Sequence, residues 1–97
     1  MPRFEPMDYA ILNLSGDNYL EWAMNTSVIL QSRGLGRSII QGDYATRSEK
    51  LRAITIMRHH LNEELINQYL HIENPRDLWT ELKSRYTIVL LPKVRHE

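Results

Sequence analysis

The sequence has 97 residues, the size of one small domain, and its 42% hydrophobic and 25% charged content is that of a folded globular protein. Twelve basic and twelve acidic residues give a formal net charge of zero, whereas RNA binding usually needs a basic excess to neutralise phosphates. The absence of cysteine excludes disulfides, thiolate metal sites and a cysteine nucleophile, and it fits a reducing, cytoplasmic compartment. No apolar run approaches the ~20 residues of a membrane span, and the proline-containing start is not expected to act as a signal peptide.

Residues 1–13 are predicted to form an N-terminal arm, with an extended stretch at 9–14. A Ser-Gly-Asp-Asn turn cluster follows at 15–18, and either of its last two residues can cap a helix. The first helix is expected to run from about Asn18 to Arg33. Its apolar positions recur at helical spacing on one face: Tyr19, Trp22, Ala23, Thr26, Ile29 and Leu30.

The middle of the chain predicts a short helical turn at 35–40 and then two helices. Thr46 and Glu49 have the spacing of a capping box, which indicates a helix start at 46. The apolar stripe of that helix consists of Leu51, Ile54, Met57 and Leu61. Asn62, followed by two acids, predicts a fresh helix start, with Leu65, Ile66, Tyr69 and Leu70 on its buried side.

The last predicted helix begins at Asn74-Pro75, because a capping residue directly precedes a proline at the first helical position. Its apolar face consists of Leu78, Trp79, Leu82 and Tyr86, and the helix is expected to end at about Tyr86. The run 87–91 is continuously apolar and β-like in composition. Its sole plausible partner strand in the sequence is the stretch 9–14.

These elements predict an all-α domain, a small bundle of about four to five short helices with an extended N-terminal arm. The helical domain spans 14–86, and 87–97 form an apolar segment followed by a basic tail. The expected core consists of ten residues: Trp22, Leu30, Leu51, Ile54, Met57, Leu61, Leu65, Leu78, Trp79 and Leu82.

Three pieces of the chain carry motifs whose order and spacing are informative together. The stretch 14–22 reads L-x-G-x-N-Y-x-x-W, the stretch 57–70 covers the middle helices, and 74–86 contains P-x-x-L-W-x-x-L-x-x-R-Y. Together they resemble the Gag polyprotein of copia-type LTR retrotransposons, with wording closest to plant elements. The residues that match the two outer motifs are Leu14, Gly16, Asn18, Tyr19, Trp22, Pro75, Leu78, Trp79, Leu82 and Tyr86.

The resemblance implies a structural role, in which a capsid-type domain self-associates into a particle shell that encloses the element's RNA. It implies no catalysis and no cofactor. Thr87 directly follows Tyr86, where relatives carry several polar residues, and the sequence stops at Glu97, before any zinc knuckle. A truncated or degenerate copy is therefore expected, with RNA contacts made mainly by downstream regions that this sequence lacks.

Several residues also invite sharper interpretations. Trp22 and Trp79 lie in apolar stripes and are expected in the core rather than in a binding groove. His59 and His60 form i, i+4 pairs with Glu63 and Glu64, but a metal site needs three or four converging ligands, so no metal is expected. Nothing near these histidines supplies a nucleophile with a base and an orienting group, and no enzymatic activity is predicted.

Self-association is predicted to involve the apolar run after Tyr86, because a domain this small cannot easily bury all of it. Its residues are Ile88, Val89, Leu90 and Leu91.

Four basic residues near the C-terminus, Lys83, Arg85, Lys93 and Arg95, are expected to be a solvated end, since four charges make a weak nucleic-acid site. The alternatives are a domesticated helical adaptor that binds another protein and, third, a weak RNA-binding module. No small-molecule substrate and no membrane partner are expected.

Overall fold

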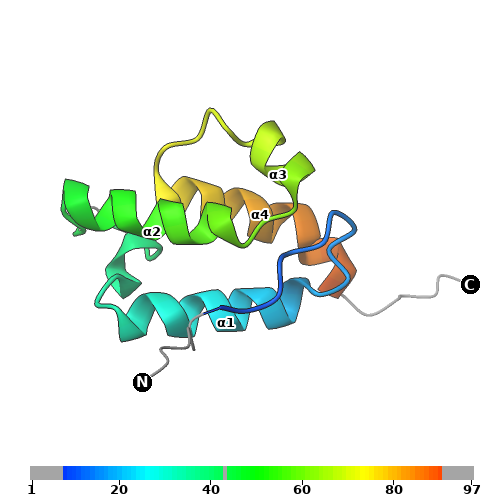
Figure 1. Ribbon diagram of the computed structural model, residues 1–97, viewed down its shortest axis with the longest axis horizontal. Helices are drawn as coiled ribbons and strands as arrows, with labels where there is room; N and C mark the ends of the chain where they lie inside the picture. The colour runs from blue at the N-terminus through cyan, green and yellow to red at the C-terminus, as the bar shows by residue number, and fades with distance from the viewer. Residues whose placement is uncertain (1–7, 43, 91–97) are drawn as a thin grey trace, which may run out of the picture.

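The computed structural model describes residues 8–42 and 44–90, without the side chains of 88–90, and within these residues it is all-α, as predicted. Four α-helices and one short 3-10 helix follow one another along the chain (Figure 1). They are α1 (Tyr19–Ser32), η1 (Gly36–Ser38), α2 (Arg47–His59), α3 (Glu63–Gln68) and α4 (Pro75–Leu90). In Figure 1, α1 forms one side of the molecule, and α2, α3 and α4 lie together on the other.

Three helix starts are confirmed where the sequence places capping residues. The Glu49 amide donates to the Thr46 hydroxyl (3.1 Å) and the Thr46 amide to the Glu49 carboxylate (2.8 Å), a complete capping box for α2. Asn62 Oδ1 accepts from the amide two residues later (2.8 Å) and opens α3. Asn74 Oδ1 accepts in the same way (2.8 Å), directly before Pro75, the first residue of α4.

The expected side-chain cap on α1 is wrong, because Asn18 uses its side chain to hold the preceding segment instead. Its Oδ1 accepts from the Asn13 amide (3.0 Å), and its Nδ2 donates to the Ile11 carbonyl (2.9 Å). Asn13 in turn donates to Asp17 Oδ1 (2.7 Å). The turn before α1 therefore fixes where the N-terminal segment lies.

Residues 8–14, called the N-terminal segment below, are extended and pack against the helices. Leu12 is fully buried and forms an isolated parallel β-bridge with Leu61. The Leu12 amide donates to the His60 carbonyl (2.9 Å), and the Asn62 amide donates to the Leu12 carbonyl (3.0 Å). The partner of this extended stretch is thus the α2–α3 junction and not the run after Tyr86, whose residues 87–90 are helical.

Helix α4 runs past the expected end at Tyr86 and includes residues 87–90, although their composition taken alone is β-like. β-branched residues lower helix propensity only slightly, and nothing in the run breaks a helix before Pro92. The Thr87 hydroxyl donates to the Lys83 carbonyl within the last described turns.

The core lies between α1 and the other helices and buries eight of the ten residues expected there. The two exceptions are Trp79, which is half-buried against the core, and Leu51, which is 52% exposed. Leu51 lies in the second turn of α2 and lines a shallow surface pocket with Arg33, Arg52, Thr55 and Ile56. Periodicity placed Leu51 near the correct face but could not show where the neighbouring helices end.

Candidate functional site

The two motifs that carry the family resemblance come from opposite ends of the chain and meet in space. Gly16 has φ +77°, and a Cβ at this position would lie 2.1 Å from a ring carbon of Tyr86. The Tyr86 hydroxyl donates to the Leu14 carbonyl (2.7 Å). The Tyr86 ring therefore occupies the space that the missing side chain of Gly16 leaves.

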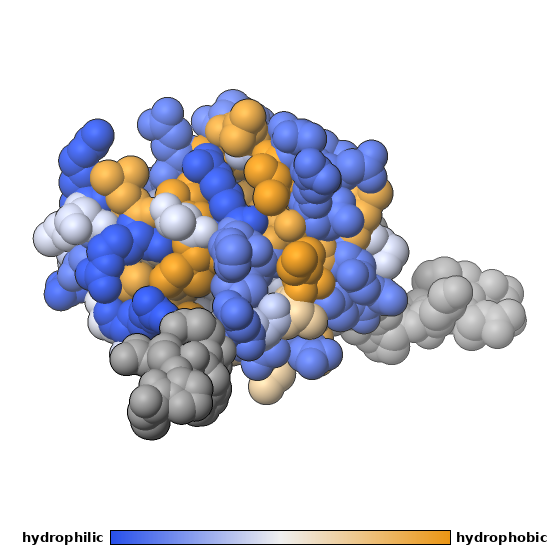
Figure 2. All heavy atoms as spheres, viewed as in Figure 1, coloured by the Kyte–Doolittle hydropathy of each residue, from blue (hydrophilic) through white to orange (hydrophobic). Residues whose placement is uncertain are grey.

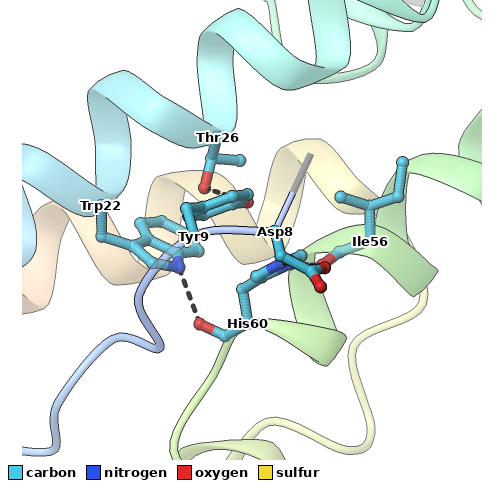
Figure 3. Close-up of polar contacts among 6 residues, drawn as sticks. All are labelled: Asp8, Tyr9, Trp22, Thr26, Ile56 and His60. Atoms are coloured by element: carbon cyan, nitrogen blue, oxygen red, sulfur yellow. Dashed lines mark hydrogen bonds and ion pairs between the residues drawn. The ribbon is translucent and has the colours of Figure 1, made fainter. Parts of the chain in front are cut away.

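An aromatic row continues this contact across the domain. The ring centroids of Tyr86 and Tyr19 lie 5.6 Å apart, those of Tyr19 and Trp22 6.2 Å, and those of Trp22 and Trp79 6.1 Å. The buried indole nitrogen of Trp22 donates to the His60 carbonyl (2.8 Å) (Figure 3). The remaining motif residues of α4 are buried as well: Pro75, Leu78 and Leu82. The motif residues thus mainly join α1 to α4.

Arg85 is engaged in the contact between α3 and α4. Its guanidinium donates to Gln68 Oε1 (2.6 Å) and the Tyr69 hydroxyl (3.1 Å). It also lies 5.8 Å from the Tyr69 ring centroid and 5.4 Å from that of Tyr86. Of the other basic residues expected at this end, Lys83 is exposed, and Lys93 and Arg95 lie outside the described residues.

Burial raises the pKa of three tyrosines above the ordinary value: Tyr9, Tyr19 and Tyr86. For Tyr9, a hydrogen bond between its hydroxyl and Thr26 Oγ1 (2.7 Å) partly offsets this rise. For Tyr86, the positive charge of Arg85 lowers the pKa and so also partly offsets the rise caused by burial. Burial therefore favours the neutral form of each of these hydroxyls over its phenolate.

The two histidines do not form the expected pairs with Glu63 and Glu64. Helix α2 ends at His59, and α3 begins only at Glu63, so the i, i+4 spacing spans a break between helices. His60 lies in that break, is 6% exposed, and stacks flat on Tyr9 with ring centroids 3.8 Å apart and an interplanar angle of 5° (Figure 3). Asp8 Oδ1 lies 3.8 Å from its Nε2.

Sequence reasoning missed a second apolar stripe, on the outer face of α1. Leu20, Met24 and Val28 are 56%, 62% and 62% exposed, and their i, i+4, i+8 spacing places them on one face. The buried face of the same helix consists of Tyr19, Trp22, Thr26 and Leu30. The i, i+4, i+8 spacing of these three residues can be read from the sequence. Because one apolar stripe is enough to anchor a helix, the sequence analysis did not distinguish this second stripe from the buried one.

Elsewhere, exposed apolar residues lie on different elements. On the face seen in Figure 2, orange residues form small groups separated by hydrophilic ones. The remaining large exposed apolar residues of the described chain are Ile11, Ile40, Tyr44, Leu51 and Leu70. Scattered residues of this kind are ordinary for a protein surface, whereas three on one helix face form a candidate contact surface.

The apolar run predicted to mediate self-association is described only in its backbone. Ile88, Val89 and Leu90 form the last turn of α4, and Leu91 lies outside the described residues. Its role in contacts between copies stays a prediction. Of the described helices, none is long and apolar enough to cross a membrane.

Searches against protein-family models, curated proteins and solved structures find no match to this chain. A proposal for its function therefore depends on its own residues, the resemblance carried by its motifs and the surface described above.

Proposed function

We propose that this chain is a capsid-type helical domain of a copia-type retrotransposon Gag protein, and that it self-associates in assembly of the particle shell. The order and spacing of its motifs support the family, and its helical fold is compatible with it. The observation that carries the self-association is the outer stripe of α1, formed by Leu20, Met24 and Val28, each more than half exposed. Apolar surface of this kind is stabilised when another apolar surface covers it.

The stripe is complementary to itself. When two copies of α1 pack antiparallel about a two-fold axis at Met24, Leu20 of one copy faces Val28 of the other, and both Met24 side chains meet. Antiparallel helix dipoles add a small favourable term, and the zero net charge of the chain leaves no large repulsion between copies.

One such contact is expected to be weak, with a dissociation constant of about micromolar or higher, because shell proteins gain strength from many repeated contacts. A two-fold contact closes on itself and yields a dimer, so growth of a shell requires a second contact surface. The run from Ile88 to Leu91 is our proposal for that second surface. RNA is expected to play little part in either contact, given the zero net charge.

Sedimentation velocity over a range of protein concentrations tests this function. We expect concentration-dependent dimers or larger species, and Met24→Glu should weaken them because it places two like charges at the axis. Leu51→Glu is the matched control, since it changes another half-exposed apolar helix residue and should leave association unchanged. Leu90→Glu combined with Leu91→Glu tests the second surface.

A folded monomer at every concentration up to about millimolar would contradict the proposal and favour the adaptor that binds a different protein. A mobility-shift assay with RNA distinguishes the third possibility, an RNA-binding module, from the other two. Retardation of RNA at physiological salt, without self-association, would favour the RNA-binding module.

A further inference from the structure

Three metal-ligating side chains converge where the N-terminal segment meets the end of α2. They belong to Asp8, His59 and His60, and each offers one ligand atom within 4.8 Å of the other two. The same three residues line a pocket of about 190 Å³, together with Ile29, Arg33, Thr55 and Ile56. Asp8 and His59 are exposed, whereas His60 is buried.

His60 presents a buried nitrogen that the described part of the chain leaves without a hydrogen-bond partner. Its Nδ1 lies 2.8 Å from the Ile56 carbonyl, and because a carbonyl oxygen can only accept, Nδ1 carries the proton. In the neutral ring, Nε2 is then a bare lone pair, and no hydrogen bond satisfies it. A buried polar atom in this state is rare, and it requires an explanation.

The ring is also held in place, which a metal ligand requires. Tyr9 stacks flat on it, and the hydrogen bond to Ile56 fixes both its tautomer and its rotation (Figure 3). Metal-bound histidines typically donate their second ring N–H to a carbonyl or carboxylate in this way. In Figure 3 the Asp8 carboxylate lies beside the same ring, with its Oδ1 3.8 Å from Nε2.

We propose that Asp8, His59 and His60 bind one divalent transition-metal ion, with zinc as the best match. Two imidazoles and one carboxylate with a water in the fourth position form a familiar tetrahedral zinc set, whereas magnesium and calcium prefer oxygen ligands. Bonds of about 2 Å require ligand atoms about 3.3 Å apart, so the cluster must contract slightly. The exposed side chains of Asp8 and His59 can supply this movement while His60 stays fixed.

The bound ion would join the N-terminal segment to the α2–α3 junction, beside the backbone bridge of Leu12. Its effect is therefore stabilisation of the segment 8–14, and it does not depend on the proposed self-association. The positive charge of Arg33, which also lines the pocket, opposes a cation and favours modest affinity. The competing explanation is a simple ion pair between Asp8 and protonated His60, which binds no metal.

Zinc titration of the full chain, prepared without a histidine tag, tests the proposal. Calorimetry should show one equivalent bound, and the melting temperature should rise by about 5 °C or more at a zinc concentration ten times Kd. In nuclear magnetic resonance spectra, zinc should shift the Nε2 signal of His60 while Nδ1 remains protonated. Asp8→Asn and His59→Gln should each weaken zinc binding at least about tenfold.

Two variants serve as matched controls, because both lie outside the cluster. His71→Gln removes another exposed histidine, and Glu64→Gln removes an exposed acid near the same junction. Both should bind zinc as the unaltered chain does. Absence of stoichiometric zinc binding, an unchanged His60 Nε2 signal, or equal loss of binding in His71→Gln would overturn the proposal and favour the ion pair.

Discussion

At the scale of single residues, Gly16 and Gly34 allow a backbone cost to be separated from a packing cost. Both have positive φ, +77° and +74°, but a Cβ on Gly16 would strike the Tyr86 ring, whereas a Cβ on Gly34 meets nothing within 4 Å. We expect Gly34→Ala to cost about 1 kcal/mol of unfolding free energy, the strain of a left-handed alanine. Gly16→Ala should cost about 2–4 kcal/mol, since the aromatic contact between the two motifs must also shift.

Urea unfolding of both variants measures this difference. Equal losses of stability in Gly16→Ala and Gly34→Ala would show that the Tyr86 ring does not lie against Gly16. The described contact between the first and last motifs would then be contradicted.

The buried tyrosine hydroxyls predict a loss of stability at alkaline pH. Because burial raises the pKa of Tyr9 in the folded state, the folded chain keeps this proton when the unfolded chain has lost it. The resulting stability is fully present below the unfolded value of about 10 and is lost as pH rises through the higher folded value. Tyr9→Phe should therefore flatten the decline of unfolding free energy between about pH 9 and 11.

Tyr44→Phe is the control for this measurement, because Tyr44 is 67% exposed and its hydroxyl should not contribute to the decline. Urea unfolding at a series of pH values gives both slopes. An unchanged slope in Tyr9→Phe would mean that its hydroxyl is not buried against Thr26.

At the scale of elements, the N-terminal segment is the part whose importance the sequence understated. Leu12 is fully buried, while its neighbour Ile11 is 50% exposed. We expect Leu12→Ala to cost about 2–5 kcal/mol, through lost burial and the cavity it leaves. Ile11→Ala, the matched control, should cost under about 1 kcal/mol. Thermal unfolding of the two variants measures this difference in stability. Similar melting temperatures for both would show that the segment is not part of the core.

Helix starts and the main core were predictable because their signals are local. At three helix starts a side chain accepts a hydrogen bond from a backbone amide two or three residues later. These side chains belong to Thr46, Asn62 and Asn74. Elements that depend on distant partners were not predictable. The side chain of Asn18 bonds to the segment before α1 rather than to the amides of α1, and the partner of Leu12 is a junction about fifty residues away.

The candidate sites show the same division. Motif spacing identified Tyr86 and Gly16 as residues of interest, but their mutual contact requires the tertiary fold. The convergence of Asp8 with His59 and His60 was invisible for the same reason, since the sequence paired these histidines with the nearby acids of α3. Local pattern predicts which residues matter within an element and cannot predict which elements meet.

At the scale of the whole molecule, α1 has a buried inner face and an exposed apolar outer face. An exposed apolar face is stabilised when a second surface covers it, and in our proposal that surface is the α1 of another copy. The zero net charge permits this close approach. We therefore expect copies of the chain to associate through α1.

Disulfide trapping tests this claim most directly, because the chain has no cysteine of its own. In a two-fold antiparallel contact, Met24 faces Met24 of the second copy, so Met24→Cys places two thiols within bonding distance. Under mild oxidation, Met24→Cys should form covalent dimers much faster than Leu51→Cys, a thiol on an equally open helix surface. Equal rates for the two variants, with both chains folded, would contradict the α1 contact.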